Sequence, residues 1–148
     1  MRIVEGMLQL KSATAMLGYL NAPSPFTPDG WLNTGDLVEQ EGEYIRILGR
    51  KSDLINVGGQ KVYPAEVEDV ILAQPNIADV VVTGEKHALL GHIVVAKVRL
   101  VEAEPLDALR LRIRKACLAK LTAYKVPAKV LLLLEQEIYS ARFKKMRR

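Results

Sequence analysis

The chain has 148 residues, of which 49% are hydrophobic and 26% are charged, a balance typical of a soluble globular protein. Its length suits one ordinary domain, or a small domain joined to a piece of another. No apolar run approaches the roughly 20 residues of a bilayer-spanning helix, and the first residues lack the apolar core of a signal peptide, so we expect no membrane span and a cytoplasmic location. The single cysteine, Cys117, excludes an intrachain disulfide.

The formal net charge of +4 reflects the last seven residues, which hold five of the 21 basic residues. A basic tail of this kind is typical of a solvated segment, or of one that binds nucleic acid or an anionic membrane. The aromatic residues are too scattered along the chain to form a stacking platform for bases. We therefore expect no nucleic-acid partner, and a basic-tailed nucleic-acid binder stays an alternative.

Strand signals dominate the first third of the chain. Residues 7–11 and 43–48 alternate between apolar and polar side chains, as half-buried strands do. Residues 22–30 hold three prolines and an Asp-Gly pair, which are typical of a loop. Because 48 residues of this kind are too few for a core of their own, we expect residues 1–48 to be the incomplete, β-rich end of a larger domain.

From residue 49 onwards, strand and helix patterns occur in mixed order. Strands are predicted at residues 53–57, 60–63, 77–83, 93–101 and 126–134. One helix begins at Pro64 and ends before Pro75, and a second follows Pro105. The apolar stripe of the second helix is formed by Leu106, Leu109, Ile113 and Cys117. This order predicts that residues 49–148 form a small α+β domain with short antiparallel sheets and two to three helices.

Two segments carry residues suited to chemistry: residues 30–37, GWLNTGDL, and residues 49–68, GRKSDLINVGGQKVYPAEVE. In the first, Asp36 follows Thr34-Gly35, which reads as a flexible turn. A carboxylate can accept hydrogen bonds from two adjacent ribose hydroxyls, and the guanidinium of Arg50 would add a rigid fork of donors. In the second, a Gly-Gly pair lets the backbone approach a ligand closely, although an ordinary hairpin turn also explains it.

Together with residues 121–127, LTAYKVP, these segments resemble the signature of adenylate-forming enzymes, which include acyl-CoA synthetases, aryl-acid ligases, peptide-synthetase adenylation domains and luciferases. The resemblance implies that residues 1–48 end a large adenylation domain and that residues 49–148 form its mobile C-terminal lid. It implies a reaction in which ATP and Mg²⁺ activate a fatty or aryl carboxylic acid as acyl-AMP, and the acyl group then passes to a thiol, with coenzyme A expected. The phosphate loop and acyl pocket of the family lie outside these residues, so we expect the chain alone to be inactive and to hold no cofactor tightly.

The same resemblance implies roles for single residues in nucleotide binding and adenylation. Asp36 and Arg50 would bind the ribose of the adenylate, and Lys61 would approach its phosphate. Lys144 would be the catalytic lysine that stabilises charge as the mixed anhydride forms, with Lys145 beside it as the alternative. Each of these roles comes from the family and not from the residue spacing.

For the second half-reaction, the resemblance assigns the thiol tunnel to Gly58 and Gly59 and the hinge of the lid to Ser52. Glu66 and Glu68 match glutamates at a helix start in the family. We expect them to interact favourably with the positive end of the helix dipole and to pack against neighbouring residues. His87 and His92 have no cysteine near them, so we predict no metal site.

Two further alternatives stay open. The thiol acceptor can be a carrier protein, as in an adenylation domain of peptide or polyketide synthesis. The chain can also be a non-catalytic, lid-like module that binds a nucleotide or a partner.

Overall fold

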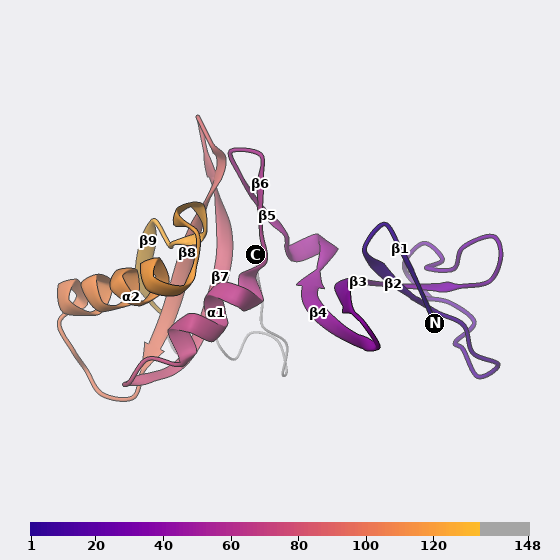
Figure 1. Ribbon diagram of the computed structural model, residues 1–148, viewed down its shortest axis with the longest axis horizontal. Coiled ribbons are helices and arrows are strands. Elements are labelled where there is room, and N and C mark those ends of the chain that lie inside the picture. The colour runs from indigo at the N-terminus through magenta and orange to yellow at the C-terminus, as the bar shows by residue number, and fades with distance from the viewer. Residues whose placement is uncertain (134–148) are drawn as a thin grey trace. The chain divides into compact units, whose positions relative to one another are not determined.

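The computed structural model describes residues 1–133, which form two compact units (Figure 1). Unit 1 is Met1–Ser52, and unit 2 begins at Asp53. Each unit has its own sheet, and both α-helices of the described residues lie in unit 2. The predicted α+β class is thereby confirmed. The domain boundary expected after residue 48 stays a prediction, and strand β4 (Tyr44–Arg50) runs across that position.

Unit 1 is a sheet of four antiparallel strands that pair in chain order. Its strands are β1 (Arg2–Val4), β2 (Met7–Leu10), β3 (Leu32–Glu41) and β4. The β1–β2 turn passes through Glu5 and Gly6, both at positive φ, and Gly42 lies at positive φ between β3 and β4. Strands β2 and β4 lie where the alternation predicted them, whereas the sequence pattern did not indicate β1 or β3.

The Thr34-Gly35-Asp36 segment lies inside β3, and the expectation of a turn there was wrong. Strand β3 advances four residues, from Asn33 to Leu37, while β2 advances two opposite them. The surplus residues form a β-bulge, in which Gly35 adopts a φ of +77°. A glycine that reads as a turn in the sequence therefore allows a bulge within a long strand.

The sheet of unit 2 has five strands and carries the longest pairing in the chain. A 3-10 helix, η1 (Lys51–Asp53), precedes it. The strands are β5 (Ile55–Val57), β6 (Gln60–Val62), β7 (Ile77–His87), β8 (Gly91–Leu100) and β9 (Lys129–Leu132). They lie in the order β6-β5-β8-β7, with β9 beside β8. All pairs are antiparallel except β8–β9, which is parallel, a direction that the apolar pattern of a strand does not specify.

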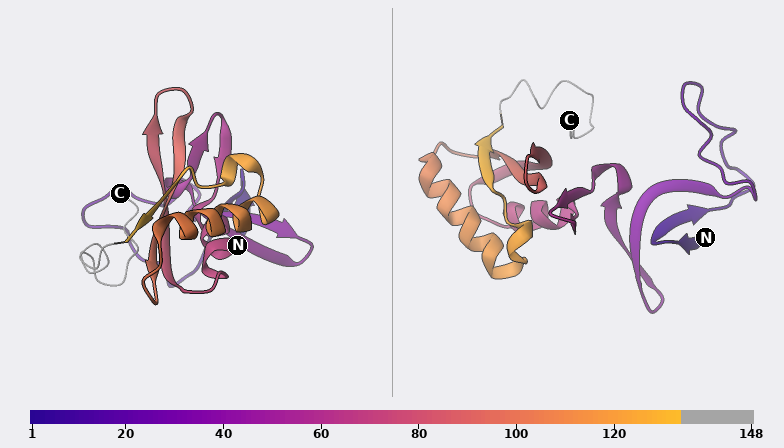
Figure 2. Two further views of the ribbon diagram at one scale, coloured as in Figure 1. Left: turned by 90° about the vertical axis from the view of Figure 1, so that its left-hand side faces the viewer. Right: turned by 90° about the horizontal axis from the view of Figure 1, so that it is seen from above.

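Two helices, α1 (Pro64–Leu72) and α2 (Leu106–Lys120), pack with this sheet into one core (Figure 2). Both begin as the prolines predicted, since Pro64 is the first residue of α1 and Pro105 directly precedes α2. The predicted stripe of α2 is confirmed, because Leu109, Ile113 and Cys117 are completely buried. Burial raises the pKa of the Cys117 thiol to about 11, so this thiol stays neutral at pH 7.

Glu68 attaches α1 to the edge of the sheet. Strand β7 is an edge strand, and the amide of Val82 donates a hydrogen bond of 2.9 Å to Oε1 of Glu68. Glu68 itself is buried. A buried amide at a sheet edge needs an acceptor, so this carboxylate satisfies a donor that no neighbouring strand can reach.

Candidate functional site

Asp36 and Arg50 face each other across two strands of unit 1. They are directly opposed in the β3–β4 register, and Arg50 Nε donates to Oδ1 of Asp36 at 3.2 Å. The side chains are 26% and 57% exposed, respectively. An ion pair this open contributes little stability. A carboxylate has several lone pairs and a guanidinium five N–H donors, so both groups keep capacity for a ligand such as a ribose.

The bulge in β3 fixes the backbone at Asp36. Thr34 Oγ1 accepts the Asp36 amide at 3.1 Å and donates to the carbonyl of Leu8 at 2.9 Å. The Gly35 amide donates to Asn33 Oδ1 at 3.3 Å. The hydroxyl of Thr34 therefore ties the bulge to β2, a role that the sequence did not reveal because Leu8 is 26 residues away.

A second cluster in unit 1 attaches the loop before β3 to β1 and β2. Arg2 binds Asp29 through two guanidinium nitrogens, donates to Gln9 at 2.7 Å, and lies 4.6 Å from the ring centroid of Trp31. The hydrogen bond from Arg2 lowers the pKa of Asp29 to about 2. Cation–π and bidentate contacts of this kind fix the orientation of the side chains that they join. They hold the Asp-Gly-Trp segment that leads into β3.

The Gly58–Gly59 turn joins β5 to β6 as a two-residue hairpin. Both glycines have positive φ, 57° and 86°, as a type I′ turn requires. The Gly59 amide donates to Asn56 Oδ1 at 2.8 Å. A Cβ at Gly59 would meet nothing within 4 Å, so glycine is needed here for its conformation, and the space beside it is open. Both interpretations of the Gly-Gly pair therefore hold: it is an ordinary hairpin turn, and it leaves open space in which a ligand would fit.

Of the remaining predicted residues, Lys61 and Ser52 lie in the described part of the chain. Lys61 is exposed on β6, opposite Asn56 in the register. Ser52 lies in η1, at the end of unit 1. Lys144 and Lys145 lie outside the described residues.

Glu66 connects the start of α1 to the LTAYKVP segment. Its Oε1 accepts the Tyr63 amide at 3.1 Å, and its Oε2 accepts Lys125 Nζ at 2.6 Å. Both side chains of the ion pair are largely buried. The sequence predicted Glu66 as a helix-start residue, but it did not predict the partner 59 residues away.

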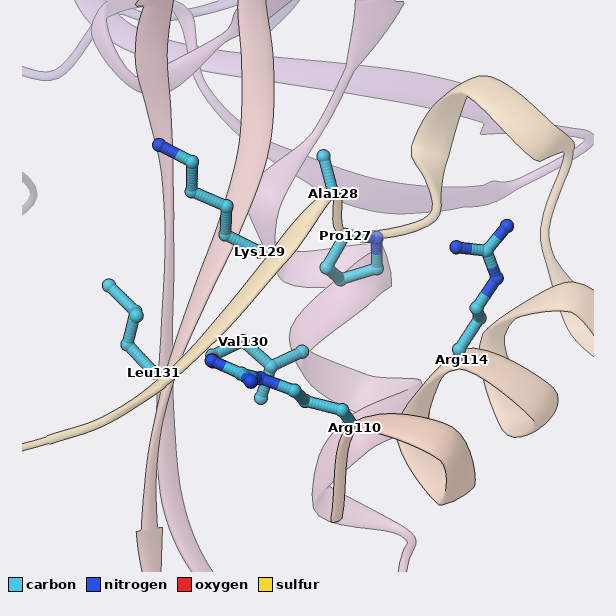
Figure 3. A pocket seen from close by; sticks show the side chains of 7 residues that line it. All are labelled: Arg110, Arg114, Pro127, Ala128, Lys129, Val130 and Leu131. Carbon is cyan, nitrogen blue, oxygen red and sulfur yellow. The ribbon is translucent and has the colours of Figure 1, made fainter. Parts of the chain in front are cut away.

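A groove of about 480 Å³ lies between α2 and β9 (Figure 3). It is lined by Arg110, Arg114, Pro127, Ala128, Lys129, Val130 and Leu131. Arg110 is held by the Val130 carbonyl, and Lys129 is paired with Glu85. Among residues 1–133, none of the predicted site residues lines this groove.

Within residues 1–133, no group of three or more His, Cys, Asp or Glu side chains is placed to hold a metal ion. No helix in the same part of the chain is long and apolar enough to cross a membrane.

The chain is similar to known CoA ligases in sequence and in fold. It is 38% identical over 130 residues to the long-chain-fatty-acid–CoA ligase of Haemophilus influenzae, an alignment that covers 84% of this chain and 22% of that protein. It superposes on the anthranilate CoA ligase AuaEII in complex with anthranoyl-AMP with a TM-score of 0.78 and 30% identity, over 87% of this chain and 26% of the other. For the o-succinylbenzoate CoA synthetase of Bacillus subtilis in complex with ATP and magnesium ion, the TM-score is 0.72 and the sequence identity is 35%. This superposition covers 84% of this chain and 26% of the synthetase.

The chain thus spans about a quarter of the length of these ligases. Residues 66–139 match the family model described as AMP-binding enzyme C-terminal domain. This match contains α1 from residue 66 onwards, the β7–β8 hairpin, α2 and β9, which supply most of the core of unit 2. The resemblance inferred from the signature segments is therefore confirmed, and the chain belongs to the family of AMP-binding enzyme C-terminal domains.

Proposed function

We propose that this chain is part of an ATP-dependent acid–thiol ligase, which forms acyl-AMP and then an acyl thioester with coenzyme A. The observation that carries the proposal is the Asp36–Arg50 pair, held open to solvent at a β-bulge in a chain of this family. Residues 1–48 would end the large adenylation domain, and residues 49–148 would form the lid. A cytoplasmic location suits an enzyme that uses ATP and coenzyme A.

In the first half-reaction, a carboxylate oxygen of the acid attacks the α-phosphorus of ATP, and pyrophosphate leaves. The proposed part of Asp36 is to accept hydrogen bonds from the ribose hydroxyls, while Arg50 donates from the opposite strand. Lys61 would approach the phosphate, and Lys144 would offset the charge that grows between carboxylate and phosphate. Mg²⁺ would reach the site on ATP, since the described residues offer no group of side chains to hold it.

In the second half-reaction, the thiol attacks the acyl carbon and AMP leaves. The Gly58–Gly59 turn suits this step, because its open side gives a narrow thiol arm room to pass. Two half-reactions in one site require two lid orientations, and Ser52 in η1 would be the hinge. The three ligases described above favour coenzyme A over a carrier-protein thiol.

The test uses the complete enzyme, with the large domain joined to this chain. Acid-dependent ATP–pyrophosphate exchange should be present, and Asp36→Ala should lower its rate by about 100-fold, a typical loss for a group that positions the reacting nucleotide. Glu39→Ala is the matched control, because Glu39 and Arg46 form a similar cross-strand ion pair on the same two strands.

The control variant Glu39→Ala should leave the rate of ATP–pyrophosphate exchange unchanged. Thioester formation with coenzyme A, and none with a carrier protein, would settle the acceptor. Absence of acid-dependent exchange in the unmodified enzyme would refute the proposal and favour a non-catalytic module.

A further inference from the structure

The turn between β7 and β8 is hydrogen-bonded to the Gly58–Gly59 turn. The Gly58 amide donates to the Leu90 carbonyl at 2.8 Å, and Val57 pairs with Gly91 in the sheet. A Cβ at Gly58 would lie 3.6 Å from Cδ2 of Leu90. The two turns are therefore in direct contact, and a shift of Leu90 would displace Gly58.

His87 organises the β7–β8 turn through its imidazole ring. It is the last residue of β7, and its Nδ1 accepts hydrogen bonds from the amides of Leu89 and Leu90, each at 3.3 Å. To accept these hydrogen bonds, Nδ1 must carry a lone pair, so the two contacts require the tautomer with its ring proton on Nε2. Leu90 is thus held on both sides: His87 binds its amide, and its carbonyl binds Gly58.

We propose that His87 is a positioning residue for thiol transfer, acting on the Gly58–Gly59 turn through Leu90. This inference rests on the proposed function, in which that turn lines the path of the thiol. Asn56 holds Gly59 from within the β5–β6 hairpin, and Leu90 holds Gly58 from outside it. Without the contact at Leu90, Gly58 departs from the orientation that leaves the path open, although Val57 still pairs with Gly91.

A purely structural role for His87 makes a different prediction. If the ring only stabilised unit 2, its loss would impair both half-reactions together. Positioning of the Gly58–Gly59 turn instead impairs thiol transfer far more than adenylation, because Asp36 and Arg50 lie in the sheet of unit 1 and Lys61 lies beyond the turn, on β6. The ratio of the two half-reaction rates therefore distinguishes the two roles.

The first test measures the contact itself in the 148-residue chain, independently of catalysis. Amide hydrogen exchange at Leu90 and Gly58 should be about tenfold faster in His87→Leu, which loses the acceptor. His87→Asn should restore slow exchange, because an asparagine side chain can accept amides of the following residues. His92→Leu is the matched control and should leave both amides unchanged. Unchanged exchange in His87→Leu would overturn the proposal.

The second test uses the complete enzyme with pre-formed acyl-AMP. His87→Leu should slow thiol transfer about tenfold, with ATP–pyrophosphate exchange within twofold of the unmodified rate. His87→Asn should recover most of the loss, and His92→Leu should lose nothing. An equal loss in both half-reactions, or none in thiol transfer, would overturn the positioning role. Failure of the proposed function would appear separately, because the unmodified complete enzyme would then have no activity. The amide hydrogen-exchange rates of the 148-residue chain would still show whether His87 holds Leu90.

Discussion

Unit 1 and unit 2 bury very different amounts of apolar surface. Among the described residues of unit 1, Val38 is the single hydrophobic side chain that is buried, and Leu17 and Leu20 are fully exposed. Unit 2 has a continuous core, to which both helices and its sheet contribute. In unit 1 the side chains instead form exposed ion pairs across the sheet and the cluster around Arg2. Ion pairs at an exposed surface contribute little, so unit 1 lacks the main source of folding free energy.

Under the proposed function, this difference corresponds to a division of roles along the chain. Unit 2 can act as a rigid body that carries the Gly58–Gly59 turn, because its core holds the elements around that turn. Unit 1 offers the Asp36–Arg50 pair on a sheet with little interior, as expected of a piece that completes a larger domain. If unit 1 completes a larger domain, as we propose, the exposed leucines of its loop would contact that domain.

The largest expected effect follows from separating the two units. Residues 49–148 should fold cooperatively on their own, because they contain the buried core. Residues 1–48 should not fold alone. Circular dichroism and thermal melting of both pieces would measure this. A cooperative melting transition in the 1–48 peptide would show that its sheet needs no other domain.

Truncation of a buried side chain should reveal the same difference between the units within the intact chain. Ile113→Ala, at a completely buried position of α2, should lower the free energy of unfolding by about 2–5 kcal/mol. Ile47→Ala, on an exposed position of β4, should change it by less than about 0.5 kcal/mol. Denaturant titration gives both values, and alkylation of Cys117 should accelerate in Ile113→Ala only. Similar costs at both sites would mean that unit 1 also has an effective core.

The smallest effect concerns the acid stability of unit 1. Because Arg2 lowers the pKa of Asp29 from 3.8 to about 2, the pair stabilises the folded state fully above about pH 4. That contribution is lost as the pH falls towards 2, since protonation removes the negative charge. An NMR titration of the Asp29 carboxyl should show the low pKa in the unmodified chain and a higher pKa in Arg2→Met, in which the hydrogen bond with Thr27 still lowers it. Arg46→Met serves as the control and should leave the Asp29 titration unchanged.

The helices of unit 2 could be predicted because their residues carry the whole signal. The spacing of Leu109, Ile113 and Cys117 gives the buried face, and a proline marks each start. Strand β3 could not be predicted in the same way. Its polar sequence has no alternation, and its ends are set by β2 and β4, which pair with it.

The candidate site shows the same limit. Resemblance to a family pointed to Asp36, Arg50 and the Gly-Gly pair, but the partners that hold them are distant in sequence. Thr34 reaches Leu8, and Lys125 reaches Glu66, through contacts that no local pattern indicates. In the folded chain, Leu90 connects His87 to the Gly58–Gly59 turn through hydrogen bonds. From the sequence we considered His87 only as a metal ligand, and we predicted no metal site.

The central claim is that the chain serves both half-reactions through different residues, and Gly59→Leu in the complete enzyme tests it most directly. The leucine side chain would occupy the open space beside the turn, and its φ of +86° would be strained. We predict that transfer of the acyl group from pre-formed acyl-AMP to coenzyme A is lost, while ATP–pyrophosphate exchange is nearly intact. Lys144→Ala should show the reverse pattern. Equal loss of both half-reactions in Gly59→Leu, or full thiol transfer, would contradict the account.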